Sequence, residues 1–157
     1  HFRTAASSWG RLLFDISGTY YTKYDNQNSD GSYSNQIGTM FGVAVTGVLP
    51  RYKQYAAATW EMGPWSTTLA NTYQTGYIDQ SLDYFYNTRR VGSMSLWDLQ
   101  GTYTGFKNLK LTLGVKNLFD TNPPLSNMGS TFISGFDPTY YDPRARFVYG
   151  SLTYTFK

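Results

Sequence analysis

Cysteine is absent from this chain, and its single histidine is the first residue, His1. The absence of cysteine excludes disulfide frameworks, thiolate metal sites and cysteine nucleophiles. A multi-histidine metal site is excluded as well, because only one imidazole is available. The GxSxG, P-loop and HExxH patterns are also missing. We therefore expect no enzyme activity, no bound metal and no cofactor.

Charge is also scarce, since charged residues make up 15% of the 157 residues, against ~25% in ordinary soluble domains. The net charge is +3, and the basic residues are scattered along the chain. A nucleic-acid binder would gather them on one face, so we expect no nucleic-acid partner. The length suits one domain or a piece of a larger one.

Long apolar runs are missing too. No stretch approaches the ~18 apolar residues of a membrane-spanning helix, and none resembles the core of a signal peptide. A transmembrane β-barrel remains compatible with the mean hydropathy of −0.42, because its strands alternate apolar and polar residues. Without an initiator Met or a signal, the chain is expected to be an internal or C-terminal piece.

Aromatic residues are abundant at 18%, and hydrophobicity repeats with the period of two that is typical of β-strands. Helix signals are nearly absent. We expect strands at 12–24, 52–62, 65–78, 96–104, 109–116 and 146–157, with a possible short strand at 41–49. The side chains predicted to share the outer face of the sheet are Trp60, Trp97, Leu99, Leu111, Leu113, Leu152 and Phe156.

The predicted connections alternate strictly between short and long. Those at 63–64 and 105–108 are short, whereas those around 25–50, 79–95 and 119–145 are long. In an up-and-down antiparallel meander, all short turns then lie at one end and all long loops at the other. Outer-membrane barrels have this asymmetry, and aromatic residues also cluster toward their strand ends. The pattern favours an all-β, transmembrane, antiparallel up-and-down β-barrel.

The opposite face of these strands would line the lumen of such a barrel. The residues expected there are Asp15, Lys23, Asp98, Gln100, Lys110 and Lys116, which we interpret as wall lining. A soluble β-sandwich is the alternative fold, with the aromatic residues in its core. Two features count against it: the strands are longer than the ~5–6 residues usual in globular proteins, and their polar faces carry few charges.

Two segments resemble a known family. The chain reads LKLTLGVKNLFDTNPP at 109–124 and ends YDPRARFVYGSLTYTFK. Both resemble the C-terminal signature of TonB-dependent outer-membrane receptors, in which a GVxNLFD strand runs into a long loop and a final strand ends on an aromatic residue. The segments GVLPRYKQYAAATWEMGPWS and WDLQGTYTGFKNLKLTLGVKNLFD are similar to the family as well. One departure is Lys157, which follows the aromatic Phe156.

The resemblance implies a barrel of about 22 strands closed around a plug, of which residues 1–157 supply about the last six, with the plug outside this chain. It implies energised uptake of a scarce nutrient across the outer membrane of a Gram-negative bacterium, most often a ferric siderophore. The C-terminus would lie on the periplasmic side. Expected partners are outer-membrane lipid, the rest of the barrel and the plug, the TonB complex through that plug, and an extracellular ligand.

Loop residues with aromatic or cationic side chains are the candidate ligand contacts, because Tyr and Arg bind aromatic or anionic ligands efficiently. They are Tyr33, Tyr84, Tyr86, Arg89, Arg90, Phe136, Tyr140 and Tyr141, all expected to face outward. Alternatively, these tyrosines pack the loops together or lie among lipopolysaccharide head groups. Tyr154 and Phe156 are the candidate barrel-assembly signal.

The remaining loop carboxylates are interpreted as structural. Asp137 and Asp142 precede prolines and are expected to start turns. Arg144 and Arg146 flank the entry to the last strand, where they would bind lipid phosphate or pair with Asp142, and we favour the pairing.

Two other functions stay open at this stage. A secreted carbohydrate-binding β-domain would stack Tyr and Trp on sugar rings, and it would stay soluble without detergent. A passive porin would carry acidic and basic residues on opposite lumen walls, whereas this wall is mostly Thr, Ser, Gln and Gly.

Overall fold

The structure is a computed structural model that describes residues 1–39, 48–79, 87, 89–126, 135–138 and 140–156. The secondary structure in these ranges consists of β-strands and turns. Among the described residues, no helix has the length and apolar character needed to span a bilayer.

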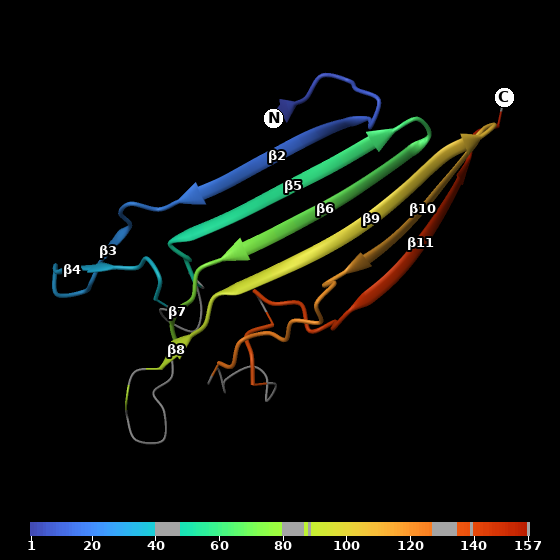
Figure 1. The fold of residues 1–157 in the computed structure, drawn as a ribbon. Coiled ribbons are helices and arrows are strands. Elements are labelled where there is room, and N and C mark those ends of the chain that lie inside the picture. Colours follow the sequence, from blue (N-terminus) through green and yellow to red (C-terminus); the bar gives the residue numbers. More distant parts are fainter. Residues whose placement is uncertain (40–47, 80–86, 88, 127–134, 139, 157) are drawn as a thin grey trace.

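Six long strands build one antiparallel sheet (Figure 1). The sheet order is β1-β2-β5-β6-β9-β10-β11, so sequence neighbours lie side by side as in a meander. The short β1 (Phe2–Arg3) forms one edge and β11 (Phe147–Tyr154) forms the other. Between them lie β2 (Arg11–Tyr20), β5 (Tyr52–Met62), β6 (Trp65–Gln74), β9 (Met94–Phe106) and β10 (Leu109–Lys116).

The connections sort to two ends of the sheet, as predicted. The turns between β5 and β6 and between β9 and β10 lie at one end, which we call the turn end (Figure 1). Positive φ angles at Gly63 (54°) and Asn108 (60°) let the chain reverse there within two residues. The long connections lie at the other end, the loop end. The first of them carries a small hairpin of β3 (Asp25–Gln27) and β4 (Tyr33–Asn35).

The two largest differences from the predicted strand boundaries lie at the loop end, in β2 and β6. The strand expected at 12–24 stops pairing at Tyr20, and the Tyr21 amide makes a last bond to the Arg51 carbonyl. The strand expected at 65–78 is two elements, because β6 ends at Gln74 and β7 (Tyr77–Ile78) pairs with β8 (Arg90–Val91). Of the possible short strand at 41–49, residues 41–47 lie outside the described residues.

Strand register separates the two faces of the sheet by chemistry. One row across it joins Phe14, Ala58, Leu69, Leu99 and Val115. We call this side the apolar face, and it holds six of the side chains predicted to share a face: Trp60, Trp97, Leu99, Leu111, Leu113 and Leu152.

The opposite side is the polar face. Every charged residue of the six long strands lies on it: Arg11, Asp15, Lys53, Glu61, Asp98, Lys110 and Lys116. Of the residues predicted to line the lumen, only Lys23 lies outside the sheet, where it pairs with Asp25 in the first long connection.

Aromatic rows border the apolar face at both ends. At the loop end, the Tyr52 ring lies 6.4 Å from Tyr20 and 6.2 Å from Tyr73, measured between centroids. At the turn end, Tyr103 lies 4.4 Å from Trp65 and 5.2 Å from Phe106. Trp65 and Tyr73 stand eight residues apart in β6, which is about 26 Å along the strand. At a tilt of about 40° this becomes about 20 Å, close to the ~25 Å lipid-facing band of outer-membrane barrels.

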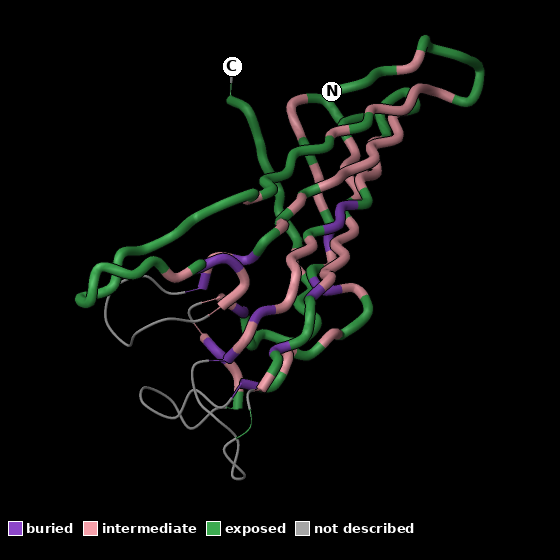
Figure 2. The backbone as a smooth tube through the Cα atoms, turned by 90° about the vertical axis from the view of Figure 1, so that its left-hand side faces the viewer, coloured by how far each residue is buried: buried purple, intermediate pink, exposed green. Residues whose placement is uncertain are grey.

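The buried core is small and lies at the loop end, where Figure 2 shows most of the buried backbone. It is built from Val48, Tyr77, Val91, Met94 and Tyr141. These residues come from three long connections and the start of β9. The core therefore joins the loops to one another and to the end of the sheet.

Candidate functional site

The polar face at the loop end carries the candidate site. Met94 and Leu96 occupy polar-face positions at the start of β9, and the loop-end core packs on them. Phe136, Tyr140 and Tyr141 of the last long connection pack at this part of the sheet, and Tyr141 belongs to the same buried cluster as Tyr77 and Met94. The alternative reading of the loop tyrosines, that they pack the loops together, fits Tyr141, which is 4% exposed.

Tyr140 holds the same connection over β5. Its hydroxyl accepts a 2.7 Å hydrogen bond from the Val48 amide. Its ring centroid lies 5.8 Å from Nζ of Lys53, on the polar face of β5, which is within the range of a cation–π contact. Residues from the last connection thus reach across the polar face to the third strand of the sheet.

Burial sets the chemistry of the two core tyrosines. It raises the pKa of the Tyr77 and Tyr141 hydroxyls above the usual range, and the Asp137 carboxylate raises both further. Both hydroxyls are therefore neutral at physiological pH and do not act as phenolate ligands. Within the described ranges, no three His, Asp or Glu side chains are grouped so that they could hold a metal ion.

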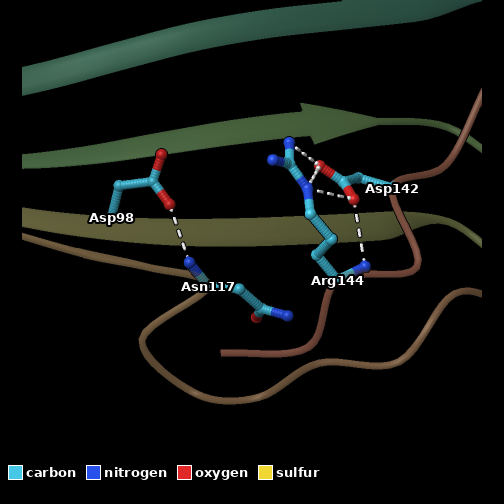
Figure 3. Close-up of polar contacts among 4 residues, drawn as sticks. All are labelled: Asp98, Asn117, Asp142 and Arg144. Atoms are coloured by element: carbon cyan, nitrogen blue, oxygen red, sulfur yellow. Dashed lines mark hydrogen bonds and ion pairs between the residues drawn. The ribbon is translucent and has the colours of Figure 1, made fainter. Parts of the chain in front are cut away.

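The NLFD segment forms a closed turn after β10. Asn117 adopts a φ of 52°, and its backbone amide donates to Oδ1 of Asp98 at 2.9 Å (Figure 3). Its side-chain amide donates to the Thr121 carbonyl, and its Oδ1 accepts from the Thr121 amide. Asp120, with a φ of 56°, accepts at 2.7 Å from the Arg146 amide at the entry to β11. These side chains satisfy the hydrogen-bonding groups of the turn's backbone. We call the motif a structural clasp, because its hydrogen bonds link β9, β10 and β11.

Of the two arginines expected to pair with Asp142, Arg144 forms the ion pair. The guanidinium Nε and Nη2 of Arg144 reach both carboxylate oxygens of Asp142, at 2.9 Å and 2.5 Å (Figure 3). Hydrogen bonds from Arg144 lower the pKa of the Asp142 carboxyl to about 2, with a smaller contribution from Lys116. Both side chains are exposed, so the pair orients the loop rather than stabilising a core.

An aromatic column on β11 continues from this ion pair. The Arg144 guanidinium lies 5.9 Å from the Phe147 ring, and Phe147 stacks on Tyr149 with centroids 6.4 Å apart. Lys116 pairs in register with Phe147. Phe147, Tyr149 and Lys53 were not among the candidates identified from the sequence. The signal was present in the alternation, which places Phe147 and Tyr149 on the same face as the strand charges.

The predicted ligand contacts do not form one cluster. Phe136 and Tyr140 are partly buried against the loop-end core. Arg90 is exposed in β8 and Arg89 is half-buried beside it, while Tyr33 lies apart in the β3–β4 hairpin. Tyr84 and Tyr86 lie outside the described residues. The prediction that all face outward is wrong for Tyr141, because packing against Tyr77 and Met94 removes it from solvent.

The proposed assembly signal lies at the turn end. Tyr154 ends β11, pairs with Leu109 and therefore belongs to the apolar face. Its ring meets Phe156 edge to face at 4.8 Å, and Phe156 is 87% exposed.

Comparisons with known proteins support the fold. No protein-family model matches the chain, and no curated protein matches it. Among solved structures, it is similar to a mutant of the ferric enterobactin receptor from Pseudomonas aeruginosa, with 22% sequence identity and a TM-score of 0.62. The match covers 98% of this chain and 21% of the receptor chain, so this chain spans about a fifth of the receptor's length. The likeness is one of fold, an antiparallel sheet of long strands.

Proposed function

We propose that this chain is part of the barrel wall of a TonB-dependent transporter in the outer membrane of a Gram-negative bacterium. The complete protein would take up a scarce nutrient by energised transport, with a ferric siderophore as the leading candidate. The NLFD and C-terminal motifs suggest this family, and the likeness in fold to a ferric enterobactin receptor supports it.

The separation of charge between the two faces is the observation that carries the proposal. Seven charged residues of the long strands share the polar face, and the apolar face has none. One charge at the bilayer midplane of a barrel costs about 2–4 kcal/mol, so lipid would enforce this separation. Leu113 on the apolar face is 71% exposed, and a soluble protein rarely leaves so extended an apolar surface uncovered.

In this proposal, the apolar face contacts lipid and the polar face looks into the lumen, toward the plug. The turn end with Tyr154 and Phe156 lies in the periplasm, and the loop end lies outside the cell. The carbohydrate-binding alternative requires two sheets packed face to face. In the part of the chain that the structure describes, the long strands form a single sheet, so nothing specific favours that alternative.

Ligand contact is proposed at the loop end, where aromatic and cationic groups meet. Tyr140 with Lys53, and Phe147 with Arg144 and Lys116, line the polar face there. Aromatic rings and cations suit an anionic, aromatic iron chelate. Arg89 and Arg90 in the second long connection and Phe136 against the loop-end core remain candidates as well, as do Tyr84 and Tyr86 from the sequence.

Uptake by the full-length protein tests the proposal. Cells that carry the gene as their only candidate receptor should accumulate a radiolabelled ferric siderophore under iron limitation, and collapsing the proton gradient should abolish this accumulation. Replacing Lys53 or Arg144 singly by Gln should in each case reduce uptake while barrel insertion is unchanged, and Lys107→Gln in the β9–β10 turn is the charge-matched control. Uptake that is insensitive to the proton gradient would indicate a porin instead. A protein that stays soluble without detergent would contradict any barrel.

A further inference from the structure

The apolar face contains a hollow near the turn end. Its volume is about 490 Å³ and it lies over Gly101 in the middle of β9. The surrounding side chains are Trp65, Tyr103, Phe106, Leu111 and Leu113. Three of these rings belong to the turn-end aromatic row, so the hollow begins directly inside that row.

The missing side chain of Gly101 keeps the hollow open. A Cβ built at Gly101 would meet no atom within 4 Å, and its φ lies outside the left-handed region. Neither backbone conformation nor close packing therefore requires glycine here. Gly105 and Gly114 differ, because a Cβ at either would collide with a tyrosine ring. The cross-strand neighbours of Gly101 are Thr67 and Leu113, so the gap interrupts a row of side chains.

The chemistry of the hollow fits a hydrocarbon chain. Apart from Gly101 and Thr102, its lining residues are aromatic or aliphatic, and none of the residues that line it is charged. One of its lining residues, Phe106, is the last residue of β9. The next residue, Lys107, is an exposed cation in the β9–β10 turn. An apolar hollow with an exposed lysine one residue beyond its lining complements a lipid with an anionic headgroup.

We propose that this hollow binds one acyl chain of a phospholipid from the leaflet at the turn end, with the phosphate near Lys107. The inference rests on the proposed function only for the membrane location. In the proposed orientation this is the periplasmic leaflet. The lipid is therefore a phospholipid rather than the lipid A of the outer leaflet.

Native mass spectrometry of the full-length protein in mild detergent tests the proposal. Gly101→Leu fills the hollow, and Ala58→Leu is the matched control, since Ala58 lies on the apolar face in β5 outside the hollow. The wild type and Ala58→Leu should retain one phospholipid to a similar extent. Gly101→Leu should retain about tenfold less, the factor expected when roughly two methylene contacts are lost. Lys107→Gln should also retain less.

Several results would overturn the inference. These are equal retention in the wild type, Gly101→Leu and Ala58→Leu, no retained phospholipid in the wild type, or a bound mass equal to lipid A. If the wild type were a dimer and Gly101→Leu a monomer, the occupant of the hollow would be a second copy of the protein. If Lys107→Gln retained as much phospholipid as the wild type, the proposed position of the phosphate near Lys107 would be wrong.

Failure of this inference and failure of the proposed function are distinguishable. Outer-membrane fractionation and proton-gradient-dependent uptake report on the function, and neither should change in Gly101→Leu. A working transporter without the lipid difference refutes the inference alone.

Discussion

The hydroxyl of Tyr149 in β11 donates a 2.8 Å hydrogen bond to Oε1 of Gln100 in β9, reaching over the strand between them. The ring crosses β10 at Gly114, where a Cβ would fall on the phenol carbons. Glycine at position 114 therefore lets the Tyr149 ring approach the backbone of β10 closely. Through this ring, the last three strands share one contact on the polar face. Phe147 stacks on the same ring, so the contact also orders the aromatic column.

Gly114→Ala should displace the Tyr149 ring and break its hydrogen bond. We expect a loss of about 0.5–1.5 kcal/mol in the free energy of unfolding, the usual net contribution of one hydrogen bond. Urea titration of the full-length protein in lipid vesicles measures it. Gly101→Ala is the control, because a Cβ there meets nothing. An equal effect of the two substitutions would contradict the role of Gly114.

Leu69→Arg should destabilise the inserted barrel strongly. Leu69 lies in the central row of the apolar face, and an Arg near the bilayer midplane costs about 2–4 kcal/mol. Thr72→Arg, in the same strand on the polar face, should cost much less. Unfolding titrations in vesicles compare the two variants, and similar losses would mean that the apolar face does not contact lipid.

Asn117 should tolerate Gly better than Ala. Both changes remove the two side-chain hydrogen bonds with Thr121, about 0.5–1.5 kcal/mol each. Ala also carries the strain of a left-handed backbone, roughly 1–2 kcal/mol. The unfolding free energies should therefore rank wild type above Asn117→Gly and Asn117→Gly above Asn117→Ala. If Asn117→Ala were more stable than Asn117→Gly, residue 117 would not keep its positive φ in solution.

The Asp142–Arg144 pair should respond to acid in a narrow range. Arg144 lowers the pKa of the Asp142 carboxyl from 3.8 to about 2, so the folded state favours the ionised form. The pair therefore stabilises the loop above about pH 4, and its contribution disappears as pH falls through about 2. Carbon-13 NMR of labelled aspartate carboxyls, with Asp142→Asn for assignment, measures this pKa.

Arg144→Gln should bring the pKa of Asp142 back toward 3.8. Arg146→Gln should leave it in place, because Arg146 is bound to Asp120 through its backbone amide. A low pKa that persists in Arg144→Gln would assign the shift to another group.

The 157-residue chain alone should not give a stable monomer. In the sheet, β1 pairs only with β2 and β11 only with β10, which leaves an open edge at each side. About eight strands are the usual minimum for a closed barrel, and open edges promote association. Size-exclusion chromatography in detergent-free buffer should show aggregates or oligomers. A monodisperse monomer there would contradict both the open sheet and the proposed barrel.

Strand positions and faces were predictable because they depend on local alternation. Leu109 to Lys116 alternates leucine with polar residues, and the structure pairs that segment as predicted. The Gly63-Pro64 turn was predictable for the same reason, since its residue types act locally. The limits of β6 were not predictable. Tyr77 continues the period-two pattern of Leu69 and Tyr73, but its pairing with Val91 starts a separate element.

The candidate site depends on contacts between segments that are distant in the chain. Aspartate at 98 and asparagine at 117 are visible in the sequence, but only the antiparallel return of β10 along β9 makes them partners. The burial of Tyr141 is similar, because Val48, Tyr77 and Met94 come from three other regions.

The sequence by itself determined the β class, the alternation of short and long connections and the separation of charged from apolar faces. These properties follow from side-chain chemistry repeated every two residues along an extended backbone. Tertiary structure alone decided which loop tyrosines are buried, that the NLFD segment is a clasp and that Gly101 leaves a hollow whereas Gly114 holds a ring. Those outcomes depend on which atoms of neighbouring strands and loops come into contact. Strand register and loop closure determine these contacts, and residue type alone does not.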